Sequence, residues 1–204
     1  MPLLTPTSDS TIARRYSIGT LEQKVQNKTA LQEQWGWPPE PRRPMLCFPA
    51  GMSDALGGAL LRDVLPGILT LPLEILVVGK GSAEYGALFT KLSREHGHRV
   101  RILPDAAENQ SQMLSASDMA LFLADPVHLE ELSSCLHYGV VPIAPACSAL
   151  EDYDPVQECG TGFLYQPSGM WQCFAALARA VETYRFPFDW RTIQRHCMES
   201  VQRC

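Results

Sequence analysis

The sequence lacks the features that mark a membrane-spanning, secreted or nucleic-acid-binding protein. No apolar run approaches the roughly 20 residues needed to span a bilayer. The start, MPLLTPTSDS, lacks the basic and then apolar layout of a secretory signal. Lys and Arg total 17 against 22 Asp and Glu, a formal net charge of −5. We therefore expect no nucleic acid and no membrane as a partner, because both attract clustered Lys and Arg.

Paired cysteines are also lacking. The chain has seven cysteines, an odd number, and no Cys-x-x-Cys pair. Cys47, Cys135, Cys147 and Cys159 lie in or beside expected strands and helices, where cysteine behaves as a small apolar residue. No group of residues shows the converging ligands and spacing of a metal site. We expect buried reduced thiols, no metal, no cofactor, and a protein of the reducing cytoplasm.

What the sequence does contain is a regular alternation of two patterns. Its 204 residues, 46% hydrophobic and 19% charged, suffice for one domain with its own core. Apolar runs typical of buried strands alternate with amphipathic stretches typical of helices. Strands are expected at residues 45–48, 74–78, 100–103, 119–124, 140–144 and 162–165. Helices are expected at residues 20–34, 54–69, 83–96, 106–116, 128–138, 169–185 and 188–202.

This alternation predicts the fold class. Continuously apolar strands indicate a sheet covered on both faces, and intervening helices indicate right-handed parallel crossovers. The sequence therefore predicts an α/β fold with a doubly wound, Rossmann-like parallel sheet over residues 45–204. Residues 1–44 are expected to pack on it as a helix followed by the Pro-rich connector WPPEPRRP. Ligands of such sheets bind beyond the carboxyl ends of the strands, where the strand order reverses.

Several segments, in the right order, resemble the bacterial glycogen synthases and plant starch synthases, which are two-domain GT-B glucosyltransferases. The segment after the family's interdomain linker is similar to PTSDSTIARRYS, LEQK and NKTALQEQWGW. The family's strand, glycine turn and helix resemble LEILVVGKGSAEY, and the elements around its donor-site loop resemble ASDMALFLAD and LHYGVVPIAP. Its end region matches GTGFLYQP and YRFPFDWRTIQRHCM, so the resemblance spans residues 5–198.

The resemblance implies the C-terminal half of a GT-B fold, the half that binds ADP-glucose. The family's N-terminal domain, which carries a Lys-x-Gly-Gly-Leu motif and most acceptor-sugar contacts, has no counterpart in this sequence. We therefore expect ADP or ADP-glucose as a ligand. We also expect an exposed apolar cleft wall and a protein partner that covers it.

The first donor-site loop has lost the family's two cations. The family flanks this loop with an Arg and a Lys, in a pattern like Arg-Leu-x-x-Gln-Lys-Gly, and positive charge stabilises the departing diphosphate. The matching stretch here is GMSDALG, so Gly51 stands for the Arg and Leu56 for the Lys. Gly51, Ser53 and Gly57, in this loop, are still expected to contact a nucleotide sugar. Three other arginines lack the matching spacing, although a loop could bring one near: Arg42, Arg43 and Arg62.

The second donor-site loop is shortened. The family has Glu-Pro-x-Gly-Leu, whose Glu lies against the donor glucose, whereas this chain reads LADPVHLEEL. Asp125 is the candidate catalytic carboxylate, as a shortened Glu-Pro, and is also a candidate sugar contact. Glu130 is either another contact or, with Glu131, an acid that stabilises the first turn of a helix. His128 has no partner that would make it a general acid.

The third donor-site segment replaces the family's Thr-Gly-Gly turn with Cys147, Ser148 and Ala149. Ser148 could still donate a hydrogen bond to a diphosphate, but two side chains now crowd the approach. No His or acid has the spacing that would activate Cys147 as a nucleophile. An aromatic residue that the family often places near the base is replaced as well, since the stretch after the third strand reads ILPDAAE.

Lys80 is the one cation that we expect at the carboxyl end of a strand. It lies in the turn GKG, which resembles the start of a dinucleotide fingerprint but has Glu84 where a third glycine is needed. We interpret the turn as a plain tight turn and Lys80 as the best remaining phosphate contact.

Three functions remain open from the sequence. The first is a glycogen synthase-like domain without transferase activity, acting as a binding or interaction module. The second is half of a split hexosyltransferase that moves glucose from ADP-glucose to an α-1,4-glucan. The third, an unrelated nucleotide-binding protein, rests on architecture alone. The first is favoured by the loss of both cations, because function depends on the site and not on the fold.

Overall fold

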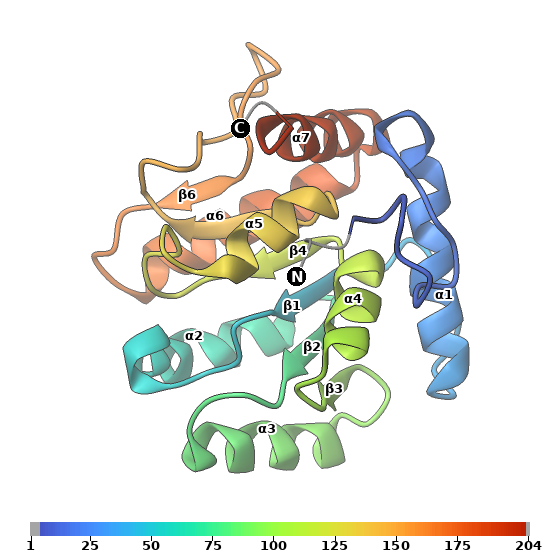
Figure 1. Ribbon diagram of the computed structural model, residues 1–204. Helices are drawn as coiled ribbons and strands as arrows, with labels where there is room; N and C mark the ends of the chain where they lie inside the picture. The colour runs from blue at the N-terminus through green and yellow to red at the C-terminus, as the bar shows by residue number, and fades with distance from the viewer. Residues whose placement is uncertain (1–4, 203–204) are drawn as a thin grey trace.

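The computed structural model describes residues 5–202 and contains a six-stranded parallel sheet with helices on both faces (Figure 1). The strands are β1 (Met45–Phe48), β2 (Glu74–Val78), β3 (Val100–Leu103), β4 (Met119–Leu121), β5 (Val141–Pro145) and β6 (Phe163–Tyr165). The helices are α1 (Lys24–Gln34), α2 (Gly58–Thr70), α3 (Ala83–Glu95), α4 (Ala107–Ala116), α5 (Glu130–His137), α6 (Met170–Tyr184) and α7 (Pro187–Ser200). Two 3-10 segments are η1 (Ile18–Gln23) and η2 (Asp54–Leu56).

The strand order is β3-β2-β1-β4-β5-β6, and every neighbouring pair is parallel. The chain builds outward from β1 to β3, crosses back, and continues from β4 to β6. In Figure 1, α4 and α5 lie in front of the sheet and α6 lies behind it. The predicted doubly wound, Rossmann-like fold is therefore confirmed, and the order reverses between β1 and β4. The loops that follow these two strands form the expected binding position.

Most element boundaries agree with the sequence prediction, and the differences have local causes. The strand predicted to end at residue 124 ends at Leu121, although the Phe122 amide still donates to the Ile143 carbonyl of β5 at 2.9 Å. There, the Tyr165 hydroxyl donates to the Phe122 carbonyl at 2.9 Å. The helix predicted over 54–69 is divided into η2 and α2 by Gly57, whose φ is 87°. The helix predicted over 20–34 begins as η1, which is kinked at Thr20.

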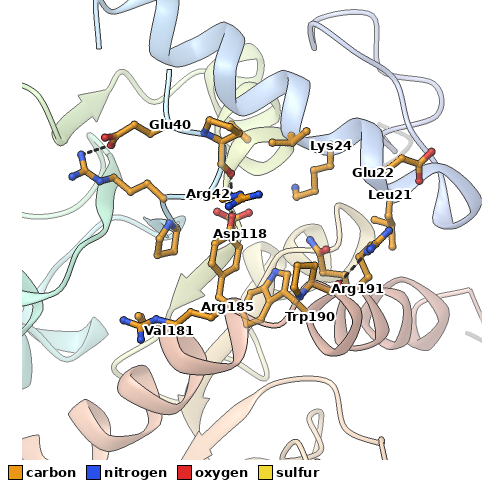
Figure 2. Close-up of a pocket in the computed structure, with 18 of the residues that line it drawn as sticks. Leu21, Glu22, Lys24, Glu40, Arg42, Asp118, Val181, Arg185, Trp190 and Arg191 are labelled. Carbon is orange, nitrogen blue, oxygen red and sulfur yellow. Dashed lines mark hydrogen bonds and ion pairs between the residues drawn. The ribbon is translucent and has the colours of Figure 1, made fainter. Parts of the chain in front are cut away.

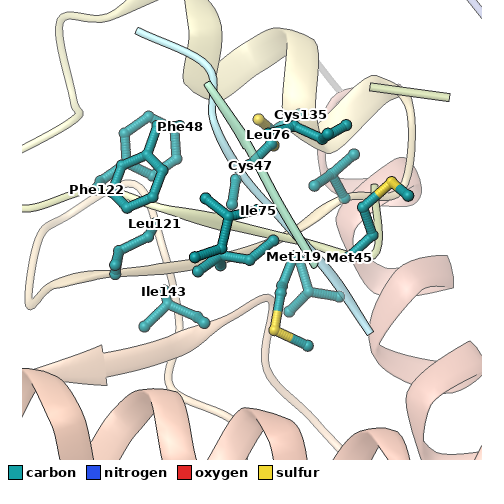
Figure 3. Packing of buried hydrophobic residues seen from close by; sticks show 14 of the residues in the cluster. Met45, Cys47, Phe48, Ile75, Leu76, Met119, Leu121, Phe122, Cys135 and Ile143 are labelled. Carbon is teal, nitrogen blue, oxygen red and sulfur yellow. The ribbon is translucent and has the colours of Figure 1, made fainter. Parts of the chain in front are cut away.

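The central strands explain the continuous apolar runs of the sequence. Every residue of β1, β2, β4 and β5 is buried. Figure 3 shows the packing of their side chains, including Phe48 of β1, Ile75 of β2 and Ile143 of β5. A strand covered by helices on both faces has no solvent face, so its residues do not alternate between apolar and polar.

The cysteines are less uniformly buried than the sequence suggested. Cys47 and Cys135 are fully buried, and burial raises the pKa of the Cys135 thiol well above its usual value. Cys147 and Cys159 are only partly buried, because they lie in loops beyond β5. All six cysteines among residues 5–202 are free.

Lys24 of α1 connects the N-terminal segment to the ends of two other helices. Its Nζ donates to the carbonyl oxygens of Leu114 at 2.7 Å and Ser115 at 3.1 Å, both in the last turn of α4. It also donates to the Tyr138 carbonyl, just after α5, at 3.1 Å. Burial lowers the pKa of Lys24 to about 7. These carbonyls are the acceptors that a helix leaves without partners at its C-terminus, so Lys24 stabilises both helix ends.

Lys28, one turn further along α1, makes a buried ion pair with Asp118. The Lys28 Nζ lies 2.5 Å from Asp118 Oδ2, and the two side chains are 1% and 10% exposed. The same carboxylate oxygen accepts a hydrogen bond from the Met45 amide at 2.8 Å, at the start of β1. Lys28 also donates to the Tyr184 hydroxyl at 2.8 Å. This network joins α1, two strand starts and the end of α6.

Candidate functional site

Two loops at the carboxyl ends of the strands are joined backbone to backbone. The Met52 amide, after β1, donates to the Lys80 carbonyl at 3.1 Å, and the Ser82 amide donates to the Met52 carbonyl at 3.0 Å. The contact needs two glycines with positive φ: Gly51 at 70° and Gly81 at 116°. A Cβ on Gly51 would lie 2.0 Å from the Lys80 carbonyl oxygen. Position 51 therefore has no room for a side chain in this loop geometry.

The start of α2 is packed equally closely against the loop after β4. Gly57 has a φ of 87°, and a Cβ there would lie 2.6 Å from the Leu123 carbonyl oxygen. Leu56 is partly buried against the hydrophobic core. Ser53, which precedes η2, makes no capping hydrogen bond with its side chain. The switch point between β1 and β4 therefore brings Ser53 and Gly57 to the expected place, with protein backbone close beside them.

Tyr85 of α3 lies against the start of α2 and contacts two charged side chains, Asp54 and Arg62. Its hydroxyl donates to Asp54 Oδ1 at 2.6 Å. The guanidinium of Arg62 lies over its ring, 5.1 Å from the centroid, and is ion-paired with Glu84. Arg62 thus contacts α3 instead of replacing the lost cations, and Asp54 adds a negative charge beside α2.

Lys80, in the loop after β2, is paired with Glu131 of α5. Its Nζ lies 3.1 Å from Glu131 Oε1. The hydrogen bond to Glu131 raises the pKa of Lys80, and the nearby carboxylates of Asp105 and Glu130 act in the same direction. The pair is partly accessible, since the Lys80 side chain is 50% exposed. The cation that we predict as a phosphate contact is therefore surrounded by three carboxylates.

The remaining predicted residues lie on neighbouring loops. Asp125 is exposed, and its Oδ1 accepts a hydrogen bond from the Val127 amide at 3.0 Å, so it caps its own turn. Glu130 is the exposed first residue of α5. Ser148 lies in an exposed turn after β5. The roles of these residues and of Lys80 stay predictions, because the structure fixes only their positions.

Acids outnumber bases where the loops of the carboxyl edge meet. Asp54, Asp105, Asp125, Glu130 and Glu131 lie on these loops or helix starts, and the bases there are Lys80, paired with Glu131, and Arg62, which lies over Tyr85. Such an arrangement can hold a ligand by backbone amides and hydroxyls. It provides little stabilisation for the negative charge that grows on a departing diphosphate. No group of three or more His, Cys, Asp or Glu within residues 5–202 is placed to hold a metal ion.

Large exposed hydrophobic side chains do not line these loops as a continuous wall. Among residues 5–202, they are Val156, Trp171, Phe186 and Phe188. Val156 and Trp171 lie beyond β5 and β6, whereas the two phenylalanines flank the start of α7 at the other end of the sheet. The partner that would cover an apolar cleft wall stays a prediction. No helix in the described part of the chain is long and apolar enough to cross a membrane.

The structure also contains a cavity that sequence reasoning missed, at the opposite end of the sheet. It has a volume of about 1140 Å³ and lies where the Pro-rich connector, α1 and the α6–α7 corner meet (Figure 2). Arg42 and Arg43 line this cavity, far from the loops that follow β1 and β4. The only signal in the sequence was an arginine-rich stretch on each side of it, PRRP and YRFPFDWR.

Comparison with known proteins agrees with the resemblance seen in the sequence. No protein-family profile matches the chain. It is 29% identical over 202 residues to the glycogen synthase of Cellvibrio japonicus and 28% identical over 200 residues to that of Bacillus cytotoxicus. Each match covers 95% of this chain but 42% of the relative. The chain therefore spans less than half the length of these relatives.

Solved structures show the same fold. The catalytic domain of starch synthase IV from Arabidopsis thaliana, bound to ADP and acarbose, matches with a TM-score of 0.81 and 23% identity. That match covers 95% of this chain and 42% of the other. Anabaena Alr3699/HepE, in complex with UDP and glucose, matches with a TM-score of 0.64 and 17% identity over 87% of this chain and 48% of the other. This chain is thus similar to glycogen synthases over 95% of its own length, and its fold is that of one half of a GT-B glycosyltransferase.

Proposed function

We propose that this chain is a glycogen synthase-like binding module that takes ADP or ADP-glucose at the carboxyl edge of its sheet but does not transfer glucose alone. The domain is proposed to comprise residues 45–204, with residues 1–44 packed on it, and to work in the cytoplasm. Its ligand class is supported by the resemblance to the family and by the similar structures, which are bound to ADP and acarbose or to UDP and glucose.

The geometry of Gly51 carries the proposal. The residue stands where the family has an Arg, and its φ of 70° and the 2.0 Å approach to the Lys80 carbonyl leave no place for a side chain. The family's Lys is replaced by Leu56, which packs on the core. Both cations that would stabilise the leaving diphosphate are absent, and losing one oxyanion-stabilising donor already costs about 100-fold or more in rate.

Nucleotide binding is proposed to rest on Lys80 and on the backbone beside it. Lys80 is half exposed, so its ammonium can turn from Glu131 towards a phosphate. Ser53 and the start of α2 follow β1 at the same edge of the sheet, where the positive end of a helix favours an anion. The three carboxylates near Lys80, on Glu131, Asp105 and Glu130, oppose that binding, so we expect an affinity well below that of an enzyme for its own donor.

The split-enzyme alternative is favoured by one observation, the match over 95% of this chain to glycogen synthases more than twice its length. In that case a separate N-terminal half would provide the acceptor site. It would also have to provide the missing positive charge. A second copy of the chain or a complete synthase could occupy the same surface without creating activity.

Calorimetric titration of the purified chain with ADP and with ADP-glucose tests the binding part of the proposal. We expect saturable binding that Lys80→Ala weakens about fivefold or more. Lys91→Ala is the matched control, because Lys91 is paired with Glu95 on the outer face of α3, away from the crevice. Equal affinities of the Lys80 and Lys91 variants, or no binding at millimolar nucleotide, would contradict it.

A further inference from the structure

The cavity of about 1140 Å³ lies at the amino ends of the strands, opposite the donor crevice. Pro44 and Pro72, which precede β1 and β2, line it, and so does Asp118, which precedes β4. In Figure 2 the connector forms its upper side in that view, and the end of α6 and the start of α7 form its lower side. Its volume is that of a small-molecule site or somewhat larger.

Two of the charged side chains that line this cavity, Lys24 and Asp118, already have protein partners for their charged groups. Lys24 Nζ donates to three carbonyls and to the Tyr16 hydroxyl. Asp118 is neutralised by Lys28 at 2.5 Å and accepts a hydrogen bond from the Met45 amide. A carboxylate compensated in this way offers little repulsion to an incoming anion.

The arginines, in contrast, have free donors. Within residues 5–202, Arg42 is exposed and makes no hydrogen bond or ion pair. Arg191 uses its Nε on the Pro187 carbonyl at 3.1 Å, which leaves both terminal nitrogens of its guanidinium free. These two side chains enter the cavity from the connector and from α7 (Figure 2).

Two further arginines have only surface partners. Arg43 lies 2.6 Å from Glu40 Oε2, and Arg185 lies 3.2 Å from Glu182 Oε2, both as i,i+3 pairs. The pair of Arg185 and Glu182 is 61% and 62% exposed, so it contributes about 0–1 kcal/mol and opens at little cost, whereas the Arg43 side chain is 29% exposed. Glu22, which is exposed, is the other acid on the wall. Four arginines thus line one cavity in a chain whose formal net charge is −5.

The walls that carry the arginines are rigid. The connector is held by prolines, which fix the backbone, and three of them line the cavity: Pro39, Pro41 and Pro44. On the other wall, Trp190 stacks on Phe163 at 6.1 Å and meets Tyr184 edge to face at 5.2 Å. The guanidinium groups are therefore presented from fixed backbone, which lowers the entropy lost when they bind a ligand.

We propose that this cavity binds a small molecule that carries two or more phosphate groups. A guanidinium matches a phosphate with two parallel hydrogen bonds, and several of them around one cavity match a ligand with several anionic groups. The cavity is separated from the donor crevice by the length of the strands. Its ligand therefore binds independently of Lys80, and the inference does not depend on the function proposed above.

Titration with inorganic tripolyphosphate at low ionic strength tests this site. We expect saturable binding with a Kd below about 1 mM, and at least about a tenfold loss of affinity in Arg42→Gln/Arg191→Gln. Both side chains are exposed, so the variant is expected to keep the fold, which urea denaturation checks. The matched control is Arg94→Gln/Arg195→Gln, which removes the same charge from two exposed arginines outside the cavity.

Lys80→Ala separates the two sites. It is expected to change the affinity for tripolyphosphate by less than about twofold and to lower the affinity for ADP. The proposal is overturned if the chain shows no saturable binding, or if both double variants lose affinity equally, since that would be unspecific attraction. It is also overturned if only Lys80→Ala weakens tripolyphosphate binding, because the anion would then occupy the donor crevice.

Discussion

The backbone of Gly51 faces the carbonyl oxygen of Lys80 so closely that a Cβ on Gly51 would lie 2.0 Å from that oxygen. The neighbouring Met52 amide donates to the same carbonyl at 3.1 Å. One contact therefore joins the loops after β1 and β2. It also excludes a side chain from position 51, which we predict to correspond to the family's phosphate-binding Arg.

Restoring that arginine is expected to damage the fold. Gly51→Arg and Gly51→Ala should both lower the free energy of unfolding by about 2 kcal/mol or more, because a left-handed φ and a steric clash add. Urea denaturation measures the loss. Gly86→Ala is the control, since Gly86 is inside α3 and a Cβ there would have nothing within 4 Å. Its free energy of unfolding should rise by up to about 1 kcal/mol. A Gly51→Arg variant with an unchanged free energy of unfolding would show that the loop after β1 adopts another backbone conformation at little cost.

Glu131 is expected to restrain nucleotide binding through its pair with Lys80. Glu131→Gln removes the charge 3.1 Å from the ammonium and should raise the affinity for ADP about threefold or more, measured by calorimetry. Glu95→Gln, beside Lys91 on the far side of α3, should leave it unchanged. If Glu131→Gln weakens ADP binding, then Glu131 contacts the ligand itself.

The buried pair of Lys28 and Asp118 is expected to be the most sensitive polar contact at the amino ends of the strands. Lys28→Met leaves an uncompensated buried carboxylate and should lower the free energy of unfolding by about 3 kcal/mol or more. The double variant Lys28→Met/Asp118→Asn should lose less free energy of unfolding than the sum of the two single variants, because it no longer buries an uncompensated charge. Additive losses in urea denaturation would mean that the two groups do not interact.

Glu74 is expected to make stability fall as pH rises from about 5 to 7. Its side chain is fully buried at the start of β2, and burial raises its pKa to about 7 despite two hydrogen bonds from the Gln32 amide. The folded state thus holds a proton that the unfolded chain, with a glutamate pKa of about 4.3, has released. The stabilisation is full below pH 4 and is lost as pH rises through 7.

Glu74→Gln tests this dependence. Between pH 5 and 7 the natural chain should lose on the order of 2 kcal/mol relative to the variant. Lys24 has the opposite effect above pH 7, because its pKa is lowered to about 7 in the folded state. A rise in the free energy of unfolding above pH 7 would therefore come from Lys24. Identical pH profiles of the two proteins in urea denaturation would exclude Glu74 as the cause.

The fold could be predicted from the sequence because its strands are buried on both faces. Continuous apolar runs gave the position of β1 and β2 without error. The same rule extended β4 too far, since Phe122 and Leu123 are as buried as a strand but lie beyond its last residue. An apolar run in the sequence indicates burial but not strand hydrogen bonding, so it cannot show where a buried strand ends.

The site could be predicted only in part. Comparison with the family's motifs identified the loops and the lost cations, which lie near each other in sequence. The pair of Lys80 and Glu131 joins residues 51 positions apart, and no spacing rule connects them. Arg42 and Arg191 line one cavity because the fold places the connector opposite the start of α7, and this depends on tertiary structure alone.

The most direct test of the central claim is incorporation of labelled glucose from ADP-glucose into glycogen by the purified chain. We predict no incorporation above that of Lys80→Ala, because Gly51 and Leu56 leave the departing diphosphate without its cations. Incorporation that increases with protein concentration and is lost in Lys80→Ala would contradict this account and show that the domain is an active transferase.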